Sequence, residues 1–197
     1  MMSKIRLGTM VAIATLSLSG CVNLGGKAPD QLISLSADTR EQVGPVTSGS
    51  MADAIIVLDP EADRSLDMLR VPVRVDPATI AYLKDIGWVE RPARQFRRLL
   101  AETLRARTNR IVVEEGDFDV LGRTTLSSRL LDMGYDARSQ SVVVRIDMRR
   151  EERAGAITSR RFEAVVPGVA PKPAPVAAAI GRAANDVADQ VASWVIE

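Results

Sequence analysis

The sequence predicts a single α+β domain, a largely antiparallel sheet with two helices packed on one face. Several short segments between residues 32 and 166 alternate apolar and polar side chains, which is typical of half-buried strands. Two longer segments, 93–107 and 176–197, instead repeat their apolar residues with the helical period. Many strands with only two helices favour helices gathered on one side of an antiparallel sheet.

The first half of the domain is predicted to hold three strands. Residues 32–36 alternate, and a polar segment rich in Gly and Ser over 39–53 then indicates a loop. Residues 54–58 form a continuous apolar run, so we expect a strand buried on both faces. Residues 69–75 alternate again, and Pro72 within them favours an edge strand because proline cannot donate to a neighbouring strand.

The first helix is expected over residues 93–107, and Pro92 suits its first turn. Its apolar stripe recurs every three or four residues and consists of Phe96, Leu99, Leu100, Thr103 and Leu104. A strand over 110–115 follows it. Strands over 124–133 and 141–149 are joined by the polar segment 134–140, which predicts a hairpin.

The chain is predicted to finish with a strand, a linker and a helix. Residues 157–166 form the last strand, and the Pro-rich segment 167–175 indicates a semi-rigid linker. The second helix then continues to the C-terminus. Its apolar stripe consists of Val176, Ile180, Ala183, Val187, Val191 and Trp194.

The N-terminus has the pattern of a secretory signal that ends at a cysteine. Lys4 and Arg6 precede an uncharged, mostly apolar run over 7–18. At about 12 residues this run is too short to cross a hydrocarbon core ~30 Å thick. The following residues, Leu18-Ser19-Gly20-Cys21, resemble a lipobox. We therefore expect cleavage before Cys21 and acylation of Cys21, so that the protein is anchored to a membrane.

Three units are predicted from this pattern: a signal peptide over 1–20, an acylated N-terminus and tether over 21–30, and a periplasmic domain over 31–197. Removing 20 of the 197 residues leaves 177, enough for one core. The remaining 24 basic and 25 acidic residues nearly balance, which argues against a nucleic-acid partner. In other lipoproteins an aspartate after the cysteine favours the inner membrane, so Val22 favours the outer membrane.

The residue types exclude several kinds of catalysis. The chain has no histidine, which removes Ser-His-Asp and Cys-His systems and histidine metal sites. Its only cysteine is the expected acylation site, Cys21. No phosphate-binding loop of the form G-x-x-x-x-G-K-[ST] occurs. We therefore expect no catalytic residue, no metal and no cofactor, and any ATP chemistry belongs to another subunit.

Two charged clusters allow a functional and a structural interpretation. Asp59, Glu61, Asp63 and Asp67 could form a calcium loop, but Arg64 stands where such a loop needs glycine, so a solvated loop is favoured. Five arginines on or just before the first helix could meet lipid headgroups or an acidic partner, although a solvated helix face is favoured: Arg91, Arg94, Arg97, Arg98 and Arg105. Trp88 and Trp194 are predicted to belong to the core.

Several of these segments resemble the ABC-type transport auxiliary lipoproteins, which include the lipoproteins of paraquat-inducible and MCE-type lipid transport systems. The resemblance is carried by Ile80-Ala81-Tyr82-Leu83, by Gly87-Trp88 and by the helix around Phe96-Arg97-Arg98-Leu99-Leu100. The late strand with Arg161-Phe162-Glu163-Ala164 and the closing Ala192-Ser193-Trp194-Val195 fit as well.

The resemblance implies a non-enzymatic adaptor that docks with an MCE-domain protein and an ABC permease and ATPase. Two other classes of protein remain open. One is an envelope-assembly or structural outer-membrane lipoprotein without a transporter. The other is a lipid-acting hydrolase, which the missing histidine disfavours.

Overall fold

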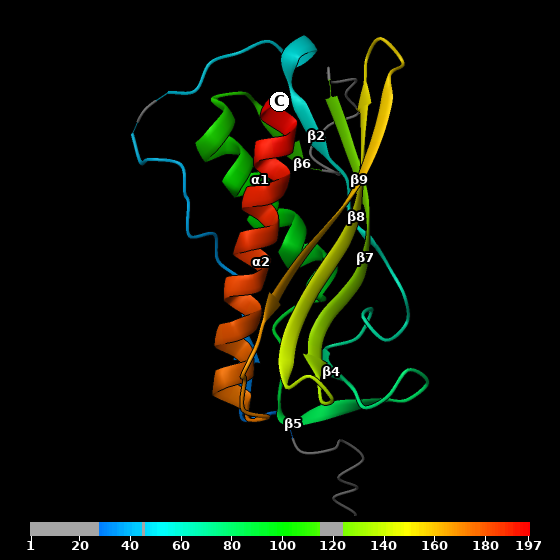
Figure 1. The fold of residues 1–197 in the computed structure, drawn as a ribbon. Helices are drawn as coiled ribbons and strands as arrows, with labels where there is room; N and C mark the ends of the chain where they lie inside the picture. The colour runs from blue at the N-terminus through cyan, green and yellow to red at the C-terminus, as the bar shows by residue number, and fades with distance from the viewer. Residues whose placement is uncertain (1–27, 45, 115–123) are drawn as a thin grey trace, which may run out of the picture.

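The protein's structure, a computed structural model, describes residues 28–44, 46–114 and 124–197 (Figure 1). It confirms one α+β domain, with two helices packed on a mixed nine-stranded sheet. The elements in chain order are β1 (Gln31–Ile33), the 3-10 turn η1 (Met51–Asp53), β2 (Ile55–Val57), β3 (Glu61–Ala62), β4 (Arg70–Arg74), β5 (Ile80–Trp88), α1 (Pro92–Thr108), β6 (Val112–Glu114), β7 (Thr124–Asp136), β8 (Ser141–Glu152), β9 (Ile157–Val166) and α2 (Pro173–Ile196).

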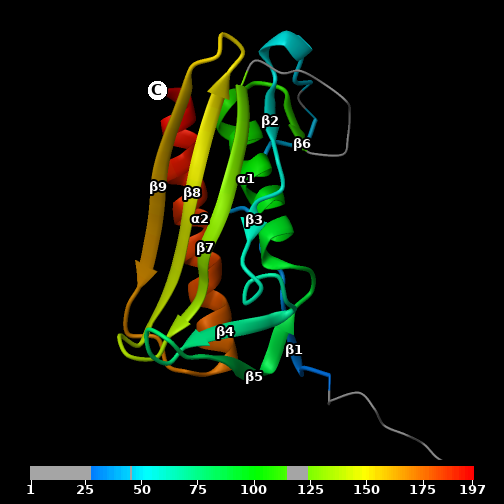
Figure 2. The same cartoon turned by 90° about the vertical axis from the view of Figure 1, so that its right-hand side faces the viewer.

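Three long strands, β7, β8 and β9, form an antiparallel ladder that makes up most of the sheet (Figure 2). Successive side chains of these strands point to opposite faces of the sheet, and the face that carries the apolar side chains is the buried one. In β8 the inward residues Val142, Val144, Ile146 and Met148 are at most 1% exposed, whereas the residues between them are only half-buried. The predicted hairpin is confirmed, although β7 continues to Asp136 and the turn covers only residues 137–140. The last strand over 157–166 is confirmed with its predicted bounds.

The shorter strands make the sheet mixed. β2 lies between β6 and β7 and is parallel to both, which explains why Ile55 and Val57 are buried. β1 is parallel to β5, and β3 and β4 are each parallel to β7. The predicted antiparallel character holds for the long ladders, while the parallel pairings involve only two or three residues of each strand.

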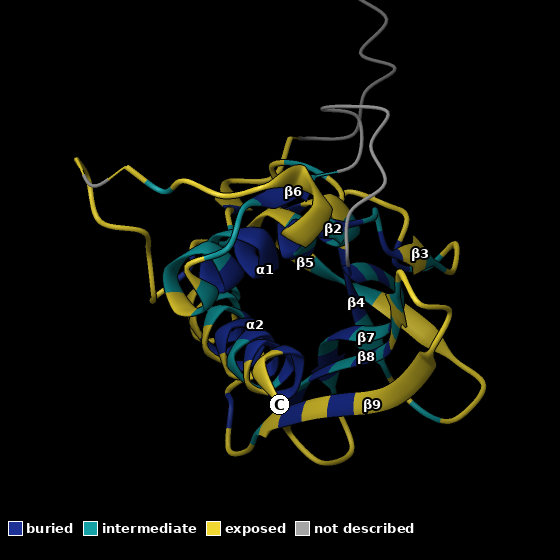
Figure 3. Cartoon of the chain, turned by 90° about the horizontal axis from the view of Figure 1, so that it is seen from above, coloured by how far each residue is buried: buried dark blue, intermediate teal, exposed yellow. Residues whose placement is uncertain are grey.

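Both helices cover the same face of the sheet, and the core fills the layer between them and the strands (Figure 3). The predicted stripe of α1 is buried, with Phe96 and Leu104 fully enclosed. Small residues on α2, among them Ala184 and Ala188, let it pack closely on α1 and on the sheet. No helix of the described part of the chain is long and apolar enough to cross a membrane.

Two sequence expectations are wrong in detail. β4 is not an edge strand, because it pairs with β5 on one side and with β7 on the other. Pro72 is tolerated because it lies at a register shift, and the pairing with β7 begins only at Val73. The segment 167–175 is not linker throughout, since α2 begins at Pro173, where proline suits a first helical turn.

The sequence periodicity assigned no element to β5, although two family motifs fall on it. The alternation of side chains between the two faces of β5 is interrupted at Asp85, which adopts a left-handed conformation with a φ of 60°. The first predicted strand, 32–36, is also shifted and occupies Gln31–Ile33.

Candidate functional site

The predicted acylation site Cys21 and most of the predicted tether lie outside the described residues, so acylation stays a prediction. The described chain begins at Ala28, at the end of the domain formed by β1, β4 and β5, which we call the tether end (Figures 1 and 2). The C-terminus and the turn between β8 and β9 lie at the opposite end, which we call the hairpin end (Figure 1).

Pro29 approaches β5 closely because Gly87 has no side chain. A Cβ at Gly87 would lie 2.8 Å from the carbonyl oxygen of Leu69 and 3.2 Å from Cγ of Pro29. It would also lie 3.6 Å from Cδ2 of Leu32, which is opposite Gly87 in the β1–β5 pairing. The chain therefore enters the domain across the surface of the tether end.

A buried amide on α1 fixes the chain that follows β1. Gln95 is 4% exposed, and its Oε1 accepts a hydrogen bond of 2.8 Å from the backbone N–H of Leu35. Its Nε2 donates to the carbonyl of Glu90 at 2.6 Å and to that of Ile33 at 3.4 Å. One side chain thus binds backbone groups of the chain at and after β1 and of the turn after β5.

A second buried amide on α2 does the same a few residues later. Asn185 is 8% exposed, and its Oδ1 accepts from the backbone N–H of Asp38 at 2.8 Å. Its Nδ2 donates to the carbonyls of Ser36 and Gly181, both at 3.0 Å. Gln95 and Asn185, which we call the amide clamp, therefore attach the entering chain to both helices.

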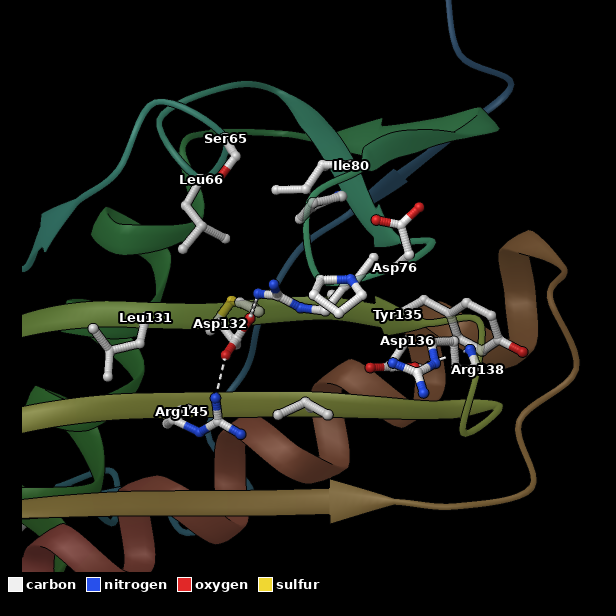
Figure 4. Close-up of a pocket in the computed structure, with 16 residues that line it drawn as sticks. Ser65, Leu66, Asp76, Ile80, Leu131, Asp132, Tyr135, Asp136, Arg138 and Arg145 are labelled. Atoms are coloured by element: carbon white, nitrogen blue, oxygen red, sulfur yellow. Dashed lines mark hydrogen bonds and ion pairs between the residues drawn. The ribbon is translucent and has the colours of Figure 1, made fainter.

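A pocket of about 350 Å³ opens between β4 and the outer face of β7 and β8 (Figure 4). A β-bulge shapes it. The register of β7 against β8 shifts between Leu130 and Asp132, so the consecutive residues Leu131 and Asp132 both line the pocket. The bulge also changes which positions of β7 face inward. Even-numbered residues such as Leu130 are buried before the bulge, and odd-numbered residues such as Met133 are buried after it.

The polar part of the pocket is an ion-pair network. One carboxylate oxygen of Asp132 lies 2.5 Å from Arg74, and the other lies 2.6 Å from Arg145. Arg145 also pairs with Glu163 on β9. The three strands β7, β8 and β9 align these side chains in one row across the outer face. Because carboxylates already bind both arginines, the network suits a structural role.

Gly134 is required where β4 approaches β7. A Cβ at this position would lie 2.4 Å from the carbonyl oxygen of Pro72 and 2.9 Å from its Cγ. We expect Gly134→Ala to lower the free energy of unfolding by about 1–3 kcal/mol, because β4 must move away. Chemical denaturation measures the change. The control is Gly181→Ala in α2, where a Cβ meets nothing within 4 Å and should raise stability by roughly 0.5–1 kcal/mol. Equal stability of the two variants would contradict the close approach.

Asp136 and Asp147 are carboxylates of the long strands whose pKa values lie below the ordinary range. The backbone N–H of Ser139 donates to Asp136 in the turn after β7 and lowers the pKa of that carboxyl. On β8, hydrogen bonds from Arg161 lower the pKa of Asp147. The lowered pKa of Asp147 therefore keeps its pair with Arg161 across β8 and β9 ionised to a lower pH than an ordinary aspartate would.

The arginines of the first helix bind carboxylates of the domain. Arg97 lies 2.9 Å from Asp59 and 3.2 Å from Glu114, and Arg105 lies 3.1 Å from Glu114. Arg91 pairs with Asp67, and Arg94 and Arg98 pair with Glu90. Within the described residues no cluster could hold a metal ion, and two carboxylates of the acidic segment 59–67, Asp59 and Asp67, instead pair with arginines at the first helix.

Both tryptophans belong to the core, as predicted. Trp88 is 1% exposed, and Trp194 packs against Phe162 with ring centroids 5.6 Å apart. The amide clamp and the bulge were not predicted from the sequence. Asn185 gave no clear signal, since it lies outside the predicted apolar stripe of α2 and Gln190 is a second amide on the same helix.

A protein-family model described as the ABC-type transport auxiliary lipoprotein component matches residues 34–192. The chain belongs to this family. Members of this family are auxiliary lipoproteins of ABC-type transport systems. The part of the chain that the family model matches includes both amides of the clamp and the bulge of β7. No curated protein matches the sequence.

Two crystal structures share the fold of this auxiliary lipoprotein. Protein XCC0632 from Xanthomonas campestris, of family DUF330, aligns with a TM-score of 0.70 at 16% identity, over 83% of this chain and 93% of that chain. An uncharacterized protein aligns with a TM-score of 0.68 at 11% identity, over 85% of this chain and 99% of that chain.

Proposed function

We propose that this auxiliary lipoprotein is the docking subunit of an MCE-type lipid transport system, held in the outer membrane through acylated Cys21 and facing the periplasm. The observation that carries the proposal is the family match over residues 34–192, which spans nearly the whole predicted domain. The proposed partners are an MCE-domain protein and the ABC permease and ATPase. The subunit itself has a binding role and no catalytic one.

The placement of the tether end supports a docking role. The eight residues 22–29 follow Cys21, and they reach at most ~28 Å when fully extended. An anchor on so short a tether keeps the domain beside one membrane surface and raises its effective concentration for a partner that reaches that surface. The hairpin end, on the far side of the domain, is then free to face the periplasm (Figure 1).

Affinity purification tests the partner. A tag on the C-terminus lies at the hairpin end, away from the tether, and extraction in mild detergent preserves membrane complexes. We expect mass spectrometry to identify an MCE-domain protein together with the tagged chain. An unrelated outer-membrane lipoprotein with the same tag is the control.

The alternatives give different results. If the anchored protein is recovered without any MCE-domain protein, permease or ATPase, it is an envelope-assembly or structural lipoprotein. If the purified protein hydrolyses phospholipids, a lipid-acting hydrolase replaces the docking subunit.

A further inference from the structure

Four large apolar side chains are exposed around Gly87 at the tether end. Leu32 is 57% exposed, Met68 41%, Leu69 53% and Val89 55%. We call these four residues the tether-end patch. They come from three separate segments, the strand β1, the loop before β4 and the residue that follows β5.

The patch is contiguous because its members lie around one glycine. Leu32 is opposite Gly87 in the β1–β5 pairing, and the carbonyl of Leu69 accepts the backbone N–H of Trp88 at 3.0 Å. Val89 lies two residues beyond Gly87, and its N–H donates to the carbonyl of Ile33 at 3.1 Å. Pro29, the second described residue, also lies beside this glycine, so the predicted tether joins the domain at the patch.

The border of the patch has the chemistry of a membrane interface. The guanidinium of Arg70 lies over the ring of Tyr82 at 4.3 Å from its centroid, and the hydroxyl of Tyr82 donates to the sulfur of Met68 at 3.3 Å. Arginine and tyrosine combine an apolar body with a polar tip and favour the headgroup level of a bilayer. The charge of Arg70 also attracts anionic headgroups.

The opposite face of these strands is part of the rigid core. Val71 is fully buried, and Ile86 and Trp88 are at most 4% exposed. The amide clamp attaches the chain after β1 to both helices. The patch is therefore presented on a fixed surface, so its orientation follows that of the whole domain.

Tether length decides which end of the domain can meet the anchoring membrane. The helix α2 has 24 residues and is roughly 36 Å long, and it runs from the tether end to the hairpin end (Figure 1). The tether reaches at most ~28 Å. An inverted domain standing on its hairpin end would place Pro29 farther from the bilayer than the tether can extend, whereas the patch lies where the tether begins.

We propose that the tether-end patch docks on the phospholipid surface that holds the acylated Cys21, with its apolar side chains at headgroup depth and Arg70 among the headgroups. Docking of this kind makes the domain stand with its hairpin end toward the periplasm. The proposal rests on the proposed lipid anchor and adds an orientation to it. The occupant of the patch is the bilayer itself.

Depth-dependent quenching in vesicles tests the proposal on the full, acylated protein. Because acylation consumes the thiol of Cys21, a cysteine introduced as Leu32→Cys carries a fluorophore at one site. Ile157→Cys is the matched control, since Ile157 is also 57% exposed but lies in the hairpin end. The vesicles contain phosphatidylethanolamine, phosphatidylglycerol and a lipid with a nitroxide at the headgroup. We expect severalfold stronger quenching at position 32 than at position 157.

A second variant separates docking from anchoring. Leu69→Glu combined with Val89→Glu should reduce quenching at position 32 to the level of position 157, while the protein still floats with the vesicles. If the labelled protein with Leu69 and Val89 intact floats with the vesicles but shows no quenching at position 32, docking is overturned and the anchor is left intact. Failure to float would overturn both. Shielding of position 32 only after a partner protein is added would assign the patch to that protein and overturn the bilayer as its occupant.

Discussion

Replacing Cys21 with serine is expected to abolish membrane attachment. The altered chain should be found as an unprocessed precursor or as a soluble periplasmic protein, because serine cannot take the thioether-linked diacylglycerol. One acyl chain alone holds a protein only marginally, with a partition constant of about 10⁴ M⁻¹, whereas two or more chains make release negligible. The change is therefore from essentially complete to essentially no attachment, measured by fractionation and immunoblotting.

A neighbouring substitution provides the control. Val22→Asp keeps Cys21 and should keep the acyl anchor, but by resemblance to other lipoproteins it should move the protein from the outer to the inner membrane. A Cys21→Ser protein that is processed and still attached normally would show that the anchor is not the acyl group.

Removing the amide clamp should cause a large loss of stability away from the membrane. Gln95→Leu leaves the backbone N–H of Leu35 without its partner, and Asn185→Leu does the same to the N–H of Asp38. Each unsatisfied group costs about 1–3 kcal/mol. For a domain of this size each kcal/mol lowers Tm by roughly 2–4 °C. Thermal unfolding measures the loss, and hydrogen exchange should show faster exchange at residues 35 and 38.

Gln190 is the matched control for the clamp. It is also an amide on α2, but its hydrogen bonds to Glu163 and Asp186 lie at the exposed surface. Gln190→Leu should change the free energy of unfolding by no more than about 0.5 kcal/mol. If the clamp variants unfolded at the same temperature as this control, with unchanged exchange at residues 35 and 38, the clamp would have no structural role.

The sequence predicted best the elements whose periodicity is local. The helix α1 and the strand β9 followed directly from their patterns, since a single buried face imposes a regular repeat. β5 was missed because Asp85 adopts a left-handed conformation that breaks the alternation. Pro72 was misplaced at an edge because a proline does not reveal where a partner strand begins to pair.

The candidate site was less predictable because long-range contacts form it. Gln95 and Leu35 are 60 residues apart, and Asn185 and Asp38 are 147 apart, so no local pattern pairs them. The bulge at Leu131 did leave a trace in the sequence. Large apolar residues occupy even positions up to Leu130 and then odd positions at Met133 and Tyr135, and this change of parity indicates an inserted residue.

Mass spectrometry of the N-terminus of the purified, membrane-extracted protein tests the anchor most directly. We expect the mature chain to begin at Cys21 and to carry a diacylglyceryl group together with any further acyl chain on its amine. An unmodified Cys21, or a chain that still retains residues 1–20, would contradict the lipid anchor and with it the proposed docking at the outer membrane.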